Sequence, residues 1–394
     1  MDIPKFQTLA GNCYPVGSLG KNDEQVCVNN VTVEEVRDYA KALENMGFTQ
    51  YAAREISAGS AYPYNVNLFY AYTREDIHVF FFWNASIHTV HITYMPPQAL
   101  PNTQSSAMED NDVFRPSLTQ FSVDGMCYVV QLADGGFILV DGGDHSEENG
   151  DKLYAFLQEK ANGQKPVIAT WFFTHPDPDH ICLAADFLEK YAKQVKVQAF
   201  AYQFPDVDKI NELPLTSRVR VDIARLESVI QAYYPNAEIY NLHMGQIYAY
   251  KGLEIEVLWS MEATYPCICT SFNDHSAAFK FAFASGKTAI LLGDCMHEIC
   301  RKLAHTYGDY VKSDILQVTH HGLIGGDKEL YALIDPEICL WPTSRTRFLG
   351  EMPDQKYQWC LGEGGCDYNR FLRDDRVRER RHYTHGETVT LYMD

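Results

Sequence analysis

The chain has 394 residues, of which 46% are hydrophobic and 13% aromatic, enough to bury one large core or two smaller ones. Its 33 basic and 52 acidic side chains give a net charge of -19, which disfavours long nucleic acid and anionic membranes as partners. The N-terminus lacks a basic and apolar leader, and no window holds about 18 uninterrupted apolar residues. We therefore expect a cytoplasmic protein without a membrane segment, whose eleven irregularly spaced cysteines are reduced thiols.

Residues 1–95 predict a small α+β domain. Thr32 and Glu35 form a capping box ahead of apolar residues at helical spacing, and Gly47 can end that helix in a left-handed conformation. Runs of β-branched and aromatic residues then indicate an antiparallel meander packed on the helix, with strands at 67–72, 77–83 and 89–95. The sequence assigns no function to this domain, and both shaping a substrate cleft and forming a homo-oligomer are open roles for it.

Residues 96–112 are rich in proline and small polar side chains and are interpreted as a linker. Residues 113–394 are interpreted as a second domain in which strands alternate with helices, a pattern typical of sheets flanked by helices. Strands are expected at 126–132, 137–140, 167–173, 195–201, 238–242, 253–259 and 314–318, a hairpin at 277–292, and helices at 148–160, 180–193, 216–233 and 296–306. A basic run at 376–381 is interpreted as a solvated face.

Potential metal ligands recur where these predicted strands end, which is where loops of α/β proteins gather functional side chains. The strand at 137–140 is followed by Asp141, and the strand at 288–292 by Gly293 and Asp294. The strand at 314–318 is followed by two adjacent histidines, His320 and His321.

The run at 174–180, Thr-His-Pro-Asp-Pro-Asp-His, holds four potential ligands directly after a buried strand. Its two prolines stiffen the loop, so His175 and Asp177 should project to the same side. Asp179 and His180 fall at the start of the next helix and can face the same pocket. A helix N-cap at Asp179 is the alternative interpretation, but capping explains only one of the four residues.

In this order the motifs resemble the metallo-β-lactamase superfamily over residues 113 to 345. Asp141 matches the first motif, His175, Asp179 and His180 the second, Asp294 the fourth and His321 the fifth. The resemblance implies an αββα sandwich, preceded here by the small α+β domain, and a hydrolase site that holds two divalent metal ions, zinc or manganese.

Two departures from the family pattern concern the ligands. Asp177 replaces the middle histidine of the second motif, and no Gly-His pair supplies the third motif between residues 193 and 289. His243 and His275 are the only histidines available for that place. The run at 273–276, Asn-Asp-His-Ser, makes the set most similar to the hydrolase domain of competence-type DNA-uptake channel proteins, which would be freestanding here.

The resemblance also implies roles for the ligands. One ion would take His175 and Asp177, and the other would take Asp179, His180 and His321. Asp294 would bridge the ions and, with Asp179, act in catalysis by a metal-bound hydroxide. Supporting or alternative ligands are Asp141, His320, Asn273, His275 and His243.

A carboxylate-rich centre with two metals favours hydrolysis of a phosphoester or phosphodiester, on a small-molecule or short anionic substrate. The first alternative is hydrolysis of a lactone, thioester or β-lactam, which would favour zinc and a more apolar cleft. The second alternative is a metal-binding module without catalysis, in which the incomplete third motif has cost one ion. A screen of these substrates together with metal analysis separates the three.

Overall fold

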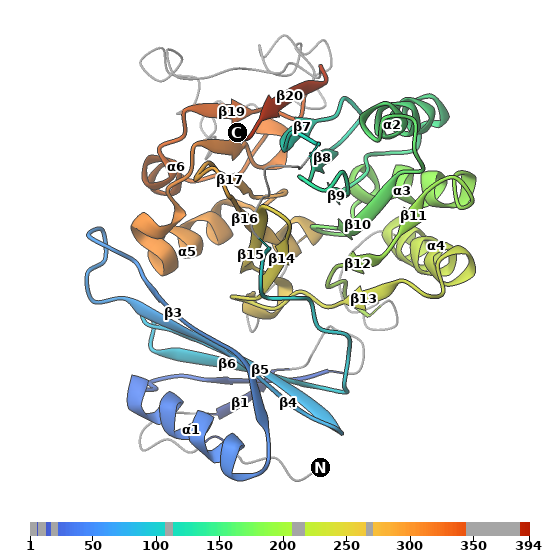
Figure 1. Ribbon diagram of the computed structural model, residues 1–394. Coiled ribbons are helices and arrows are strands. Elements are labelled where there is room, and N and C mark those ends of the chain that lie inside the picture. The colour runs from blue at the N-terminus through green and yellow to red at the C-terminus, as the bar shows by residue number, and fades with distance from the viewer. Residues whose placement is uncertain are drawn as a thin grey trace.

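The computed structural model describes residues 6, 13–16, 23–106, 113–206, 217–264, 271–343 and 387–394. In these ranges the chain forms three β-sheets, one near the N-terminus and two stacked in the remainder (Figure 1). No helix within them is long and apolar enough to cross a bilayer. The basic run at 376–381 lies outside the described residues.

The N-terminal sheet is antiparallel, with α1 (Val33–Asn45) against one face. The predicted capping box is confirmed: the Thr32 hydroxyl accepts from the Glu35 amide at 3.3 Å, and the Glu35 carboxylate accepts from the Thr32 amide at 2.8 Å. Gly47 follows the helix with a φ of 84°, a left-handed value that glycine adopts without strain. The strand order is β1-β2-β6-β5-β4-β3, with β1 Cys13–Val16, β2 Glu24–Val28, β3 Thr49–Ser57, β4 Val66–Arg74, β5 Ile77–Asn84 and β6 Thr89–Met95.

The second sheet is mixed, with the order β13-β12-β10-β9-β8-β7-β20 and β11 paired to β10. Its strands are β7 Ser117–Gln120, β8 Tyr128–Gln131, β9 Phe137–Val140, β10 Val167–Phe172, β11 Lys196–Val197, β12 Ala199–Ala201, β13 Glu238–Tyr240 and β20 Val389–Tyr392. The helices on its outer face are α2 Glu147–Lys160, α3 Pro178–Lys190 and α4 Ser217–Tyr233. Parallel pairing joins β9, β10, β12 and β13, so these strands end at the same edge.

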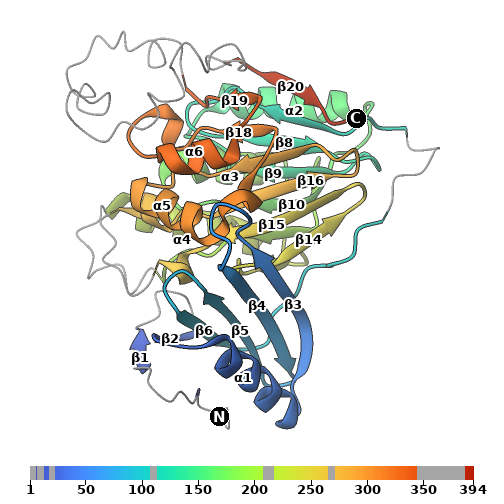
Figure 2. The same cartoon turned by 90° about the vertical axis from the view of Figure 1, so that its left-hand side faces the viewer.

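The third sheet has the order β14-β15-β16-β17-β18-β19 and carries α5 and α6 on its outer face (Figure 2). Its strands are β14 Ile247–Tyr250, β15 Leu253–Trp259, β16 Ala278–Phe283, β17 Thr288–Leu291, β18 Ile315–Gln317 and β19 Ile338–Leu340. Its helices are α5 His297–Tyr307 and α6 Lys328–Ile334, and the short 3-10 turns are η2 Met261–Ala263, η3 Phe272–His275, η4 Gly308–Val311 and η5 His320–Gly322.

Three apolar clusters hold these layers together. Between the two sheets, Phe172 packs in one cluster with Tyr248 and Phe279. The second cluster lies between the second sheet and α2 to α4, and the third lies between the third sheet, α5 and α6. The order helix, sheet, sheet, helix confirms the αββα sandwich that the family resemblance implied.

The N-terminal sheet packs its other face onto the α5 side of the sandwich. Phe69 and Phe82 belong to the same apolar cluster as Trp259 and Tyr307, and the Phe69 and Tyr307 rings are stacked at 6.2 Å. At the rim of this contact the Arg54 guanidinium pairs with Glu256 at 2.6 Å. The two parts of the chain therefore share a core.

Most predicted elements lie within a few residues of their expected bounds. Helix α3 begins at Pro178 rather than His180, and the strand expected at 195–201 is divided into β11 and β12. Several elements were not predicted, namely β1, β2, β3, β7, β14, α6, β19 and β20. Most of these are short or lie at sheet edges, where the local apolar pattern is weak.

Arg54→Met should lower the free energy of unfolding, because it leaves the buried carboxylate of Glu256 without its guanidinium partner. We expect a loss of about 2 to 3 kcal/mol, toward the low end for a buried pair, since the Arg54 side chain keeps 26% of its exposure. Denaturant unfolding measures it. The double variant Arg54→Met/Glu256→Gln removes the charge and should recover much of the loss. Equal stability of Arg54→Met and wild type would contradict the assignment.

Candidate metal centre

The strand-end residues converge at one end of the sandwich. Asp141 follows β9, the run at 174–180 follows β10, Asp294 follows β17, and the two histidines of η5 follow β18. Strands β9 and β10 are parallel to each other, as are β17 and β18, so the carboxyl ends of each pair meet there. Residues far apart in the sequence thereby form one buried polar cluster.

The carboxylate of Asp294 is the centre of this cluster. Its Oδ2 lies 3.3 Å from Nε2 of His180 and 3.3 Å from Nε2 of His321. The same oxygen lies 3.9 Å from Nε2 of His175 and 3.9 Å from Nε2 of His320. The Asp294 carboxylate thus lies close to all four of these imidazole rings.

Two overlapping groups of potential ligands surround it. The first group contains His175, His180 and Asp294, and the second contains Asp179, His180 and His321. In each group, one potential ligand atom from every residue lies within 4.8 Å of the others. Nε2 of His321 is 3.2 Å from Oδ2 of Asp179, and Nε2 of His175 is 3.6 Å from Oδ2 of Asp177. The expected positions of His175 and Asp177 on one side of the loop agree with that distance.

Hydrogen bonds at the far nitrogen fix the orientation of the histidine rings. Nδ1 of His180 donates to Oδ2 of Asp141 at 2.8 Å, and Nδ1 of His321 donates to the carbonyl oxygen of Pro342 at 3.0 Å. Nδ1 of His320 donates to the carbonyl oxygen of Ile324 at 2.7 Å. Each bond leaves the lone pair of the neutral imidazole on Nε2, which faces the cluster, as in metal-binding histidines.

The inward-facing atoms fit divalent cations. Nε2 of His175, His180 and His321 and Oδ1 of Asp294 are buried and have no hydrogen-bond partner. Buried polar atoms without a partner cost free energy, so this convergence of lone pairs and carboxylates requires positive charge at its centre. Imidazole nitrogen and carboxylate oxygen are ligands of zinc and manganese alike.

Without bound cations, the side chains compensate one another through shifted protonation. Burial would raise the pKa of Asp294, but the charges of His321 and His180 hold it well below its ordinary value. Burial would lower the pKa of His321, but the nearby carboxylates of Asp294 and Asp179 raise it to about 10. The pKa of His180 is likewise raised, against its burial, by Asp294 and Asp141.

The backbone around the ligands is strained where it turns them inward. Asp141, His320 and His321 have φ values of 57°, 50° and 55°, a left-handed conformation that non-glycine residues adopt at a cost. Gly125 packs so closely on the Asp179 backbone that a Cβ atom would lie 2.0 Å from the Asp179 carbonyl oxygen. Asp177 is the N-cap residue of α3 but makes no capping hydrogen bond, so its carboxylate is left for another role, and the capping interpretation of Asp179 was wrong.

The remaining candidates divide into two groups. Asn273 and His275, on η3, lie at the site: Nδ2 of Asn273 donates to Nε2 of His320 at 3.5 Å. The pKa of His275 is lowered to about 4 by burial, with Asp274, His175 and Asp177 as the neighbouring charges. His243 does not join them, because it stacks on Phe80 at 3.6 Å and hydrogen-bonds Glu262 at 2.9 Å.

Two supporting residues lie within the motifs at 174–180 and 273–276, but no role was predicted for either of them from the sequence. Thr174 donates its amide and its hydroxyl to the Asp141 carboxylate, at 2.8 and 2.7 Å, and its hydroxyl oxygen lies 3.0 Å from Nδ1 of His175. Ser276 accepts from the Asp294 amide at 3.1 Å. Hydroxyl residues are common on any surface loop, so only the tertiary contacts identify these two.

A family model of the metallo-beta-lactamase superfamily matches residues 123–211, which include the run at 174–180. No curated protein matches the chain. The matched residues form part of the αββα sandwich and carry the loop from His175 to His180.

Several solved structures are similar at low sequence identity. CmlA, a diiron beta-hydroxylase from Streptomyces venezuelae, is 11% identical with a TM-score of 0.43, covering 71% of this chain and 54% of CmlA. The chain thus spans about half the length of CmlA. A metallo-beta-lactamase with a HARLDQ motif from Cronobacter sakazakii is 11% identical with a TM-score of 0.34, covering 72% and 97% of the two chains. Human tRNase Z, short form, is 11% identical with a TM-score of 0.31, covering 57% and 90%.

The stability of the metal-free protein should depend on pH through these groups. A histidine whose pKa rises on folding from about 6.5 contributes stability that is complete below that pH, and for His321 it is lost as pH rises through about 10. The lowered pKa of Asp294 contributes stability above about pH 4 that is lost in acid. We expect the free energy of unfolding, measured with denaturant, to fall between about pH 7 and pH 10.

His321→Gln provides the control, because glutamine does not titrate. The variant should be less stable near neutral pH and should lose less stability on going to alkaline pH. An alkaline decline of the same size in the variant and the wild type would show that His321 does not carry the effect.

Proposed function

We propose that this chain is a metal-dependent hydrolase that cleaves a phosphoester or phosphodiester bond. The observation that carries the proposal is the share of carboxylates in the cluster, where Asp177, Asp179 and Asp294 lie among the histidines. Oxygen donors make the centre harder than an all-histidine one, which suits manganese as well as zinc and suits anionic phosphoryl substrates. The motif resemblance to competence-type hydrolase domains supports the same reaction.

The chain's own residues supply the framework for this chemistry. Two divalent ions at the centre would provide an activated water and stabilise the charge that develops on the leaving oxygen. We propose His175 and Asp177 as ligands of the first ion, and Asp179, His180 and His321 as ligands of the second. Asp294 lies within reach of both groups and is proposed as their shared ligand, while Asp141 and Thr174 hold the rings of His180 and His175 in place.

We further propose a small or short anionic substrate rather than duplex DNA. A net charge of -19 repels a long polyanion, and only the field of the bound cations would attract phosphate locally. Hydrolysis of a lactone, thioester or β-lactam is the competing reaction, and metal binding without turnover is the competing non-enzymatic role. A chromogenic phosphodiester, a lactone and a β-lactam tested side by side on the metal-loaded protein decide among the three.

Asp294→Asn should abolish most turnover of the phosphodiester, because the amide cannot carry the negative charge that both groups of ligands share. We expect the rate to fall about 10²-fold or more while the fold is retained, as judged by circular dichroism and thermal unfolding. Glu238→Gln removes a carboxylate from the exposed strand β13 and serves as the control with an unchanged rate. An Asp294→Asn variant as fast as wild type would refute a two-metal reaction at this centre.

The second functional prediction concerns metal preference. Asp177 is 27% exposed and makes no capping bond, so Asp177→His should keep the fold and present an imidazole in place of an oxygen donor. We expect manganese to restore the metal-free wild type at least as well as zinc does, and the substitution to shift the preference toward zinc. Restoration by each metal and competitive metal content give the two readouts. An unchanged preference would remove Asp177 from the ligand set.

A further inference from the structure

A second cluster of potential metal ligands lies outside the candidate metal centre. Asp144 and His145 are in the loop between β9 and α2, and Cys182 is on α3. One potential ligand atom from each of the three residues lies within 4.8 Å of the others. Carboxylate oxygen, imidazole nitrogen and thiolate sulfur are the donor atoms that bind zinc in proteins. None of the three side chains belongs to the ligands of the candidate centre.

Backbone hydrogen bonds hold this loop against the start of α3. The Gly142 amide donates to the His180 carbonyl oxygen at 2.7 Å. The Leu183 amide donates to the Gly143 carbonyl oxygen at 2.9 Å. The next two residues of the loop are therefore held beside Cys182, which lies between the two bonded positions of the helix.

The two loop side chains are oriented by hydrogen bonds of their own. Nδ1 of His145 donates to Oδ2 of Asp186 at 2.7 Å, which leaves the lone pair of the neutral ring on Nε2. A carboxylate behind the imidazole is a common support of histidines that bind zinc. Oδ1 of Asp144 accepts from the His145 amide at 2.7 Å, so this carboxylate is also held in place.

Carboxylates outnumber the arginines that they contact around this cluster. Two guanidinium groups serve four carboxylates, and the pairs are Arg218 with Asp144 at 3.2 Å and Asp222 at 3.6 Å, and Arg225 with Asp186 at 2.5 Å and Glu189 at 3.3 Å. A divalent cation would compensate the excess of negative charge.

The inner side of the cluster is the part with the least compensation. Cys182 is 2% exposed and Asp222 is 8% exposed. Oδ2 of Asp222 has no hydrogen-bond partner, because Nε of Arg218 lies 3.6 Å away. Burial and the charges of Asp222 and Asp144 raise the pKa of the Cys182 thiol to about 12, so both carboxylates act on the thiol. Positive charge at this point would lower the cost of burying them.

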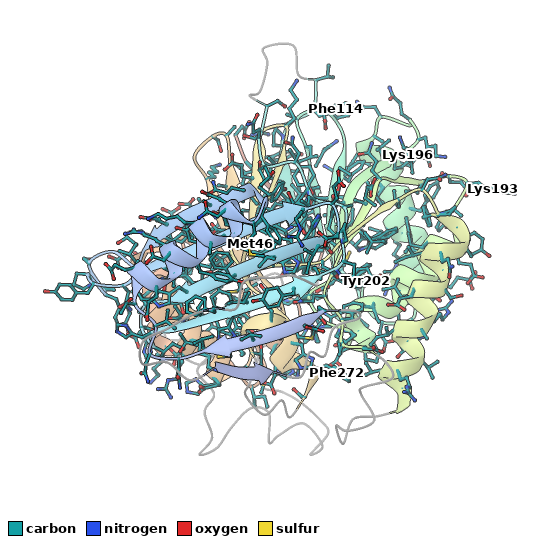
Figure 3. The ribbon with its side chains drawn as sticks, turned by 90° about the horizontal axis from the view of Figure 1, so that it is seen from below. Met46, Phe114, Lys193, Lys196, Tyr202 and Phe272 are labelled. Carbon is teal, nitrogen blue, oxygen red and sulfur yellow. The ribbon has the colours of Figure 1, made fainter. Side chains whose placement is uncertain are left out.

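A cation can reach the cluster from solvent. The Asp144 side chain is 32% exposed and that of His145 is 46% exposed. Helix α4, which carries Asp222, packs beside α3 at the outer edge of the molecule (Figure 3). Entry of an ion here does not require passage through the candidate centre.

We propose that Asp144, His145 and Cys182 form a further metal site, which takes zinc and is separate from the two positions of the candidate centre. The thiol proton passes to solvent as the bond between sulfur and zinc forms. Thiolate is a soft donor that favours zinc over manganese. The ion joins the loop after β9 to α3, and these two segments carry Asp141 and His180. The site thus stabilises the framework of the candidate centre without taking part in the reaction.

Metal content tests the proposal without reference to activity. After equilibrium dialysis against zinc, wild type should hold about one ion per chain more than Cys182→Ala does. After dialysis against manganese, the two proteins should hold equal amounts. Cys300→Ala is the matched control, because Cys300 is also a buried cysteine on a helix, and it should match wild type with both metals.

Cobalt provides a spectroscopic readout of the same site. Cobalt bound to a thiolate absorbs in the near ultraviolet, so cobalt-loaded wild type and Cys300→Ala should show this band and Cys182→Ala should lack it. His145→Gln changes a partly exposed side chain and should weaken zinc binding at this site at least about tenfold. Circular dichroism verifies that each variant is folded.

Three results would each overturn the proposal. They are equal zinc content in wild type and Cys182→Ala, no thiolate band in cobalt-loaded wild type, and unchanged zinc affinity in His145→Gln. The proposed function is tested separately: if the band is present but no phosphodiester is cleaved, the further site stands and the phosphodiesterase proposal fails. If the phosphodiester is cleaved and the band is absent, the reverse holds.

Discussion

The desolvation of one carboxylate, that of Asp294, determines how the rest of the centre is built. An ionised carboxylate that is 3% exposed is tolerated only with positive charge close to it, and four imidazoles lie within 3.9 Å of its Oδ2. In the metal-free chain, protonated His180 and His321 supply that charge. Divalent cations bound there would supply this charge instead, and the imidazoles that held them would be deprotonated.

The orientation of the side chains in this cluster depends on hydrogen bonds to the residues that surround it. Asp141 receives three hydrogen bonds, from the Thr174 amide, the Thr174 hydroxyl and Nδ1 of His180, and so positions one ligand directly. Main-chain carbonyls perform the same task for His320 and His321. The left-handed backbone at Asp141 and at both histidines of η5 is maintained by the surrounding packing, which places strain where orientation matters.

The sequence predicted the parts of this molecule that depend on local pattern. The strand before the run at 174–180 and the helix after it follow from a continuous apolar stretch and two prolines, and α1 follows from its capping box. Strands such as β7 and β14 are only four residues long, so their apolar patterns were too short to mark them. Both ring nitrogens of His243 have hydrogen-bond partners, whereas neither ring nitrogen of His275 has one. The sequence could not predict this difference, because the partners come from distant parts of the folded chain.

The apolar cluster that joins the N-terminal sheet to the α5 side bears on how this protein unfolds. Phe69 and Phe82 close a core that also contains Trp259 and Tyr307, which belong to the sandwich with the candidate metal centre. A chain without the first sheet would present these rings to water and would tend to associate through them. The sheet and the sandwich are therefore expected to unfold together as a single cooperative unit, and the sheet is not expected to detach while the sandwich stays folded.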